Sequence, residues 1–163
     1  MCYTLITEGK GRMIEMRTIF FDMDGTLGNL YAVEGWLTAL RAYDPRPYAE
    51  AAVMHNMSLL ARYLNLAKAK GYRLGIISWL SRESTQEYDL AVTEVKLEWL
   101  GEHLHSVSWD EIHIVAYGTP KEDFMAEDDD ILFDDEQRNR DNWHGQAYEP
   151  QDIIKILKEL VAD

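Results

Sequence analysis

Two aspartates two positions apart, Asp22 and Asp24, directly follow a short segment with the composition of a buried strand, Thr18–Phe21. All four residues of that segment are β-branched or aromatic, and Gly25 ends the extended stretch after the acids. Open α/β sheets bind ligands at the carboxyl ends of their strands. Two carboxylates held close together repel each other unless a cation or a proton lies between them. The stretch therefore predicts either a divalent metal site or an acid–base pair.

The hexapeptide Asp22–Leu27, DMDGTL, resembles the first motif of the haloacid dehalogenase-like (HAD) phosphohydrolase superfamily, written D-x-D-G-T-[LV]. Three further motifs follow in that family in a fixed order: a Ser or Thr that ends the next core strand, a Lys near the start of a later helix, and an acid pair after another strand. The matching positions here are Ser78, Lys121 and the pair Asp134-Asp135.

These later positions differ in how much they say by themselves. A Ser that ends a strand is more often a helix cap or a turn, so the value of Ser78 lies in its order and context. Most lysines are solvated surface charges, so Lys121 by itself could be either, and its place between two expected strands makes it the best candidate for the third motif. The acid pair is more informative, because the apolar strand Ile131–Phe133 leads straight into it. The acidic run before that strand, Glu127–Asp130, has the composition of a solvated turn.

The resemblance implies a Mg²⁺-dependent phosphomonoester hydrolase that works through an aspartyl-phosphate. In that mechanism Asp22 attacks phosphorus, and Asp24 protonates the leaving oxygen and then activates water. The second acid also distinguishes phosphatases from the dehalogenases of the family, which typically lack it.

The resemblance also implies a set of binding residues. The phosphoryl group would be held by Thr26, Ser78 and Lys121. The Mg²⁺ ion would be held by Asp22, by the backbone carbonyl of Asp24 and by the acid pair, in which Asp135 is favoured as the direct ligand and Asp134 supports it. Which of these two acids binds the metal directly stays open.

Apolar periodicity predicts alternating strands and helices, and therefore an α/β fold: a three-layer Rossmann-like parallel sheet with helices on both faces and a minimal helical cap. The expected strands are residues 18–21, 72–78, 112–116, 131–133 and 146–148, with 3–6 as either an edge strand or a loose tail. The expected helices are residues 29–42, 48–70, 83–100 and 151–160. Residues 1–17 would be an N-terminal extension and residues 18–163 the core domain, with the cap insert near residues 28–47.

The expected cap is too small for a full lid, so the site is either open or closed by the second subunit of a homo-oligomer. Aromatic residues near the site could stack on a nucleobase, although Trp36 could equally pack on the core. The aromatic residues in question are Tyr31, Trp36, Tyr43 and Trp79. The region after Ile131 is also similar to cytosolic deoxyribonucleotidases in its strand, acid pair, Trp143 and Gly145. These features favour a small phosphorylated metabolite such as a nucleoside monophosphate as substrate.

Composition restricts the alternatives. The chain has 163 residues and a net charge of −13, which opposes binding to nucleic acid and weighs against a nucleic-acid end phosphatase. A non-catalytic binding protein on the same scaffold is a third hypothesis, and the complete set of acids and lysine argues against it. Cys2 is the only cysteine, the histidines have no zinc-like spacing, and no apolar run is long enough to span a membrane. Residues 1–17 lack the apolar core of a signal peptide, so a cytoplasmic location is expected.

Overall fold

The computed structural model describes residues 2–6 and 17–162, and it contains a six-stranded sheet with the strand order β1-β6-β5-β2-β7-β8. The strands are β1 (Tyr3–Ile6), β2 (Thr18–Phe21), β5 (Arg73–Trp79), β6 (Glu111–Val115), β7 (Ile131–Phe133) and β8 (Gln146–Tyr148). All neighbours are parallel except β1, which pairs antiparallel with β6 at the edge. The expected α/β fold is confirmed, and residues 3–6 form the edge strand rather than a loose tail. The remainder of the expected N-terminal extension lies largely outside the described residues.

The central strand β2 explains why residues 18–21 are apolar throughout. All four are buried, because β2 has a parallel neighbour on each side and packed side chains above and below. Phe21 lies opposite Ile76 of β5 and Phe133 of β7. The residues that follow β2, β5 and β7 therefore leave the same edge of the sheet together.

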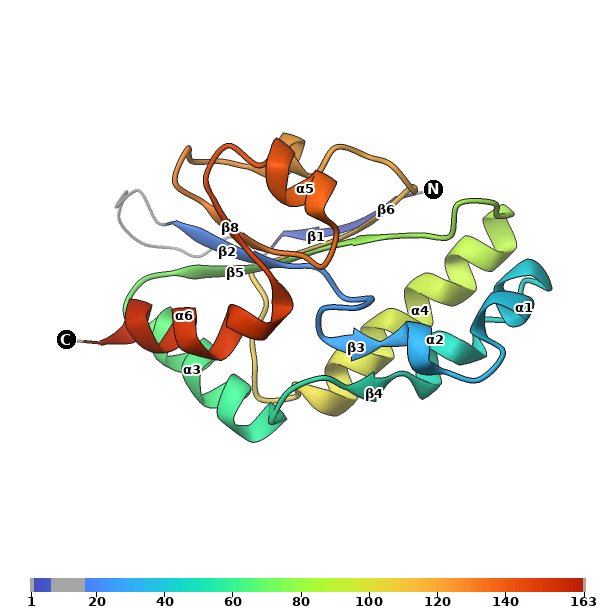
Figure 1. Cartoon of the computed structure of the whole chain (residues 1–163), viewed down its shortest axis with the longest axis horizontal. Helices are drawn as coiled ribbons and strands as arrows, with labels where there is room; N and C mark the ends of the chain where they lie inside the picture. The colour runs from blue at the N-terminus through green and yellow to red at the C-terminus, as the bar shows by residue number, and fades with distance from the viewer. Residues whose placement is uncertain (1, 7–16, 163) are drawn as a thin grey trace.

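The two faces of the sheet are covered unequally (Figure 1). The helices α3 (Met57–Ala69), α4 (Gln86–His103) and α6 (Ile153–Val161) bury the larger core, which includes Ile19, Phe21 and Ile76. The opposite face carries α5 (Gln137–Asn142) and the 3₁₀ turn η2 (Lys121–Phe124) over a smaller cluster around Phe20 and Trp143. No helix in the described part of the chain is long and apolar enough to cross a membrane.

The single helix expected over residues 48–70 is wrong. The segment instead contains the end of α2 (Arg46–Glu50), then β4 (Ala52–Val53) and finally α3. Asn56 starts α3 by accepting a hydrogen bond from the Leu59 N–H at 3.0 Å, and β4 pairs antiparallel with β3 (Gly28–Asn29). Pro47 lies in the first turn of α2, where proline is tolerated. The structured segment between β2 and α3 therefore reaches residue 53, beyond the expected cap.

Other helix boundaries also differ from the expected ones. Residues 29–42 form the 3₁₀ turn η1 (Leu30–Ala32) and the short helix α1 (Trp36–Arg41), separated by Gly35, whose φ of 70° interrupts a continuous helix. Thr85 caps α4 by accepting from the Tyr88 N–H at 3.2 Å, which moves the helix start from residue 83 to 86. A 3₁₀ turn, η3 (Pro150–Asp152), precedes α6.

The interpretation of Glu127–Asp130 as a solvated turn is wrong for Asp130, which is fully buried. Its carboxylate accepts three backbone N–H bonds, from Thr18 at 2.7 Å, Ala126 at 3.0 Å and Glu127 at 3.1 Å. The side chain thus fastens the turn before β7 to the first residue of β2.

Trp143 and Gly145 lie against the same turn. The Trp143 Nε1 donates to the Asp130 carbonyl at 2.8 Å, and a Cβ at position 145 would lie 2.1 Å from that oxygen. The two residues that carried the similarity to deoxyribonucleotidases therefore have a structural explanation that says nothing about substrate.

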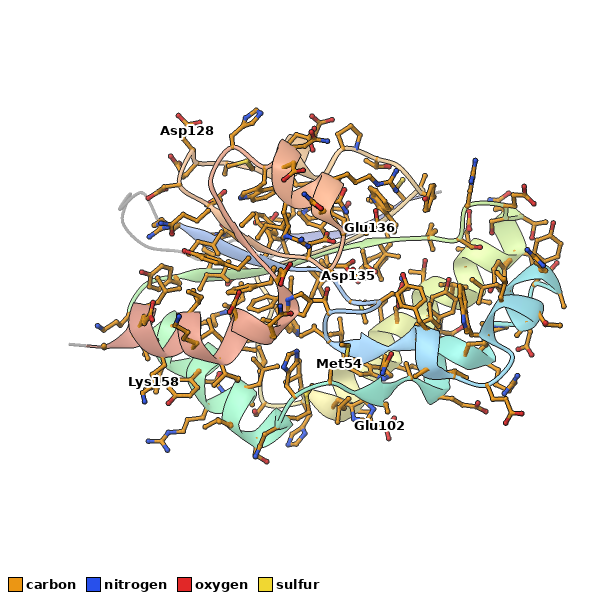
Figure 2. All side chains as sticks on the ribbon, in the orientation of Figure 1. Met54, Glu102, Asp128, Asp135, Glu136 and Lys158 are labelled. Carbon is orange, nitrogen blue, oxygen red and sulfur yellow. The ribbon has the colours of Figure 1, made fainter. Side chains whose placement is uncertain are left out.

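Replacing Asp130 with alanine is expected to lower the free energy of unfolding by about 3 kcal/mol, because buried backbone N–H groups lose a charged acceptor. Chemical denaturation at neutral pH measures the change. Asp128→Ala is the matched control: Asp128 is exposed and points away from the molecule (Figure 2), so its loss should change stability by less than about 0.5 kcal/mol. Equal effects of the two substitutions would contradict the role given to Asp130.

Candidate active site

The predicted acids gather at one edge of the sheet, where β2 and β7 end side by side. Asp22 follows β2, and Asp134 and Asp135 follow β7; the Asp22 N–H donates to the Phe133 carbonyl at 2.9 Å. One carboxylate oxygen from each of the three acids lies within 4.8 Å of the others. Figure 2 shows the labelled Asp135 on the loop that leaves β7, on the side of the sheet from which the chain runs to β3.

Gly25 makes room for this triad of Asp22, Asp134 and Asp135. Its φ is 80°, a conformation that disfavours a side chain, and a Cβ there would lie 2.4 Å from the Asp135 Oδ2. A donor set made only of carboxylate oxygens suits a hard divalent cation such as Mg²⁺. The residues present therefore fit the ion that the sequence motif implies. The side chain of Asp24 is not part of the triad, and its expected contribution through the backbone carbonyl stays a prediction.

The electrostatics of the triad also favour a cation. Burial, followed by repulsion from Asp22, raises the pKa of Asp134 to about 6. Burial, with repulsion from Asp22 and Asp134, raises the pKa of Asp135 to about 8. Both shifts mean that the negative charges are crowded in a place where water screens them poorly.

Lys121 partly balances this charge. Its ammonium is buried and contacts the Asp22 Oδ1 at 2.9 Å and the Asp134 Oδ2 at 2.6 Å. Burial acts to lower the pKa of Lys121, but the two carboxylates raise it above its ordinary value. The residue lies at the start of the 3₁₀ turn η2 rather than of an α-helix.

Thr26 and Ser78, the other predicted phosphate ligands, are fully buried beside the acids. The Thr26 hydroxyl donates to the Asp22 Oδ2 at 3.1 Å, so both oxygens of Asp22 have a donor. The Ser78 hydroxyl accepts a hydrogen bond from a lysine that the sequence patterns did not single out, Lys96. Contact of either hydroxyl with a phosphoryl group stays a prediction.

Lys96 lies on α4 with its side chain only 1% exposed. Its ammonium contacts the Asp24 Oδ2 at 2.7 Å, and this lysine opposes the effect of burial, which raises the pKa of Asp24. A sequence signal was present. Apolar spacing predicts a face at residues 88, 91, 95 and 99 of this helix, but the buried positions are Tyr88, Val92, Lys96, Trp99 and Leu100. A lysine within that stripe marks a charge that must find a buried partner.

Two residues of α5 support the acid pair. The Asn139 Nδ2 donates to the Asp134 Oδ2 at 3.1 Å. The Arg140 guanidinium donates to the carbonyls of Asp134 at 2.9 Å and Asp135 at 2.8 Å. The sequence alone assigns no role to residues 136–141, because their polar composition does not distinguish a supporting helix from a solvated turn.

A pocket of about 600 Å³ opens above the acids. The site residues Asp22, Asp24, Lys121 and the acid pair form one part of its lining, the pocket floor. Residues of η1, of α1 and of the turn after α1 form another part, the η1–α1 wall: Tyr31, Trp36, Leu37 and Tyr43. Trp36 is half-buried and packs edge-on against Tyr31 at 5.1 Å between ring centroids, so it lines the pocket and lies outside the core clusters of the described residues.

Trp79 has less free surface than its position suggests. The Arg138 guanidinium lies over its ring at 4.7 Å from the centroid, and the Tyr117 ring lies 5.0 Å away. A stacking surface for a substrate is therefore provided better by the η1–α1 wall than by Trp79.

Comparison with solved structures finds two proteins whose chains superpose on nearly the whole of this one. A protein of Mesorhizobium loti named as a HAD-like phosphatase matches with a TM-score of 0.62 and 14% identity, covering 99% of this chain and 95% of its own. The D,D-heptose 1,7-bisphosphate phosphatase of Burkholderia thailandensis matches with a TM-score of 0.57 and 11% identity, covering 90% and 99%. The chain shares the fold of these two proteins. At such low identities the HAD-like match establishes the arrangement of the elements but not the substrate. Comparison with protein-family models and with curated proteins finds no match.

Proposed function

We propose that the chain is a Mg²⁺-dependent phosphomonoester hydrolase that acts through an aspartyl-phosphate on a small phosphorylated metabolite, such as a nucleoside monophosphate. The observation that carries the proposal is the triad of Asp22, Asp134 and Asp135, with the buried Lys121 between two of its members, on the floor of a pocket. The HAD-like phosphatase fold supports it, because the triad lies at the strand ends where such sheets bind ligands.

The charges around the pocket floor account for a divalent ion. Four carboxylates gather there, those of Asp22, Asp24, Asp134 and Asp135, with the ammonium groups of Lys96 and Lys121. With all four acids ionised, a divalent cation held by the triad would balance the remaining two negative charges. When Asp24 carries the proton that it donates to the leaving oxygen, one negative charge remains for the cation to balance. When bound, Mg²⁺ supplies positive charge for the phosphoryl oxygens.

Asp22 and Asp24 have separate roles in the two halves of the reaction. Asp22 attacks phosphorus with one carboxylate oxygen, and the new O–P bond forms as the bond to the leaving oxygen breaks. Asp24 gives its proton to that oxygen. In the second half Asp24 removes a proton from water, the water oxygen attacks the same phosphorus, and inorganic phosphate leaves with the Asp22 carboxylate restored. Thr26 and Lys121 hold the two oxygens of Asp22 in place throughout.

The pocket supports a leaving group of moderate size. Its outer wall of Tyr31, Trp36 and Leu37 is apolar and aromatic, which suits a nucleoside better than a free sugar. The net charge of −13 continues to disfavour nucleic acid as substrate.

A panel of nucleoside monophosphates, sugar phosphates and phospho-amino acids tests the proposal. Phosphate release is expected with Mg²⁺ present, to disappear with EDTA, and to return with excess Mg²⁺. No release from any member of the panel, or release that EDTA leaves unchanged, would contradict it.

Metal binding has an independent readout. Mg²⁺ at about 100 times its dissociation constant should stabilise the wild type by about 2.7 kcal/mol, seen as a rise in Tm. Asp135→Asn should lose most of that rise, because Asp135 offers an oxygen to the triad. Asp128→Asn, an exposed acid outside the triad, is the matched control and should keep it.

A further inference from the structure

The buried Lys96 uses all its hydrogen-bonding capacity inside the protein. Its ammonium donates to the Asp24 Oδ2 at 2.7 Å, the Ser78 Oγ at 2.7 Å and the Trp79 carbonyl at 2.8 Å. A lysine has three N–H donors, so none is left for a substrate. Burying such a charge is costly unless it is paired, and among the described residues it is paired with the carboxylate of Asp24 alone.

The position of Lys96 is fixed from several sides. Its ammonium lies 4.9 Å from the centre of the Tyr48 ring, a cation–π contact that adds a fourth neighbour. Further along α4, the Trp99 Nε1 donates to the Ala51 carbonyl at 2.9 Å, and one end of the helix is tied by the Tyr88 hydroxyl to the Asp44 carbonyl at 3.3 Å. Hydrogen bonds therefore attach α4 to the segment between β3 and β4 on both sides of Lys96, at Tyr88 and at Trp99.

These contacts orient Asp24. Lys96 occupies Oδ2, whereas Oδ1 takes part in no hydrogen bond within the described residues, and Asp24 lines the pocket. One oxygen of the carboxyl group is therefore held and the other is free to exchange a proton with a bound molecule.

We propose that Lys96 is a positioning residue, which acts through Asp24 by holding its carboxyl group in the orientation needed to protonate the leaving oxygen. This inference rests on the proposed phosphatase function. The two buried lysines then have different roles. Lys121 contacts the nucleophile Asp22 and the acid Asp134, whereas Lys96 contacts Asp24, the residue that transfers the proton. Direct binding of phosphate by Lys96 does not fit its 1% exposure or its fully used donors.

The test is Lys96→Met assayed on two substrates of nearly the same shape. The leaving group of 4-nitrophenyl phosphate departs as a stable anion, whereas that of 4-nitrobenzyl phosphate is an alkoxide that needs a proton. The variant should lose about a hundredfold or more in kcat on 4-nitrobenzyl phosphate and less than about tenfold on 4-nitrophenyl phosphate, because general acid catalysis contributes only where a proton is needed. A purely structural role of Lys96 would lower both rates by the same factor, and that result would overturn the inference.

Two further variants keep the test decisive. Lys68→Met is the matched control: Lys68 on α3 is ion-paired with Asp110 at 3.2 Å, and its loss should leave the ratio of the two rates unchanged. In an Asp24→Asn background, adding Lys96→Met should cost less than about threefold on 4-nitrobenzyl phosphate, because Lys96 would then have no acid to position.

The outcomes separate this inference from the proposed function. If Lys96→Met does not fold, Lys96→Gln retains a neutral donor and should show the same substrate-dependent loss. A wild type that hydrolyses neither of these substrates nor any member of the panel would overturn the phosphatase function itself. A wild type that hydrolyses both, with equal losses in the Lys96 variants, would overturn only the role of Lys96.

Discussion

Asp22→Asn should release phosphate about a thousandfold more slowly than the wild type, or not at all, on whichever substrate the panel identifies. An amide oxygen is a poor nucleophile, whereas the Asn side chain still has one oxygen that can accept the hydrogen bond from Lys121 at the position now 2.9 Å away. The fold should therefore survive the substitution. Steady-state phosphate release at saturating Mg²⁺ measures the loss in kcat.

The control for Asp22→Asn is a second measurement on the same sample. Its Tm without Mg²⁺ should lie within a few degrees of the wild-type value, which shows that the lost activity is not lost folding. Metal-dependent turnover at more than about a tenth of the wild-type rate would assign the nucleophile to another residue.

Lys121→Met should reduce both stability and activity. Its ammonium lies between Asp22 and Asp134 with a side chain 2% exposed, so its removal leaves buried carboxylates without their counter-charge. Without metal, the free energy of unfolding should fall by about 3 kcal/mol, and kcat should fall about a hundredfold or more. Denaturation with and without Mg²⁺, together with phosphate release, measures the two effects.

A dependence on Mg²⁺ is part of the same prediction. The stability loss of Lys121→Met should shrink when Mg²⁺ is added, because the cation supplies charge to the same carboxylates. Lys158→Met is the control: Lys158 is exposed on α6 (Figure 2), and its loss should change stability by less than about 0.5 kcal/mol. A Lys121 variant as stable and active as this control would contradict the central position given to Lys121.

The sequence predicted the strand ends well because the signal there is local. Residues 18–21 and 131–133 are short apolar runs that lead directly into acids, and both are buried strands of the sheet. In parallel strands the side-chain pattern and the following loop determine what lies at the sheet edge. The triad of Asp22, Asp134 and Asp135 follows from that placement.

The segment between β2 and α3 was harder to predict, because the spacing of apolar residues does not reveal short breaks in a helix. Apolar residues spaced as on one helix continue from residue 48 to 70, but Asn56 caps a new helix and residues 52–53 pair with β3. A two-stranded pairing between residues 28–29 and 52–53 depends on contacts far apart in sequence, which no local pattern contains.

Lys96 and Asp130 show the same limit for charged side chains. Asp128 and Asp130 are identical in type and nearly adjacent, yet one is exposed and the other fully buried. Asp130 accepts from two N–H groups of its own turn and from the N–H of Thr18 on β2, the strand next to β7, and this last contact cannot be read from the local sequence. The partner of Lys96, Asp24, is likewise 72 residues away. In both cases the sequence shows that a charged residue is present, but tertiary packing determines which group it pairs with.

Trapping of the covalent intermediate tests the central claim most directly. The wild type is mixed with substrate and Mg²⁺, quenched in acid and reduced with borohydride, which converts an aspartyl-phosphate to homoserine, and the peptides are then analysed by mass spectrometry. The proposed mechanism predicts homoserine at position 22 of the wild type when substrate is present, and none without substrate. Rapid phosphate release with unmodified Asp22, or with homoserine at another aspartate, would contradict it.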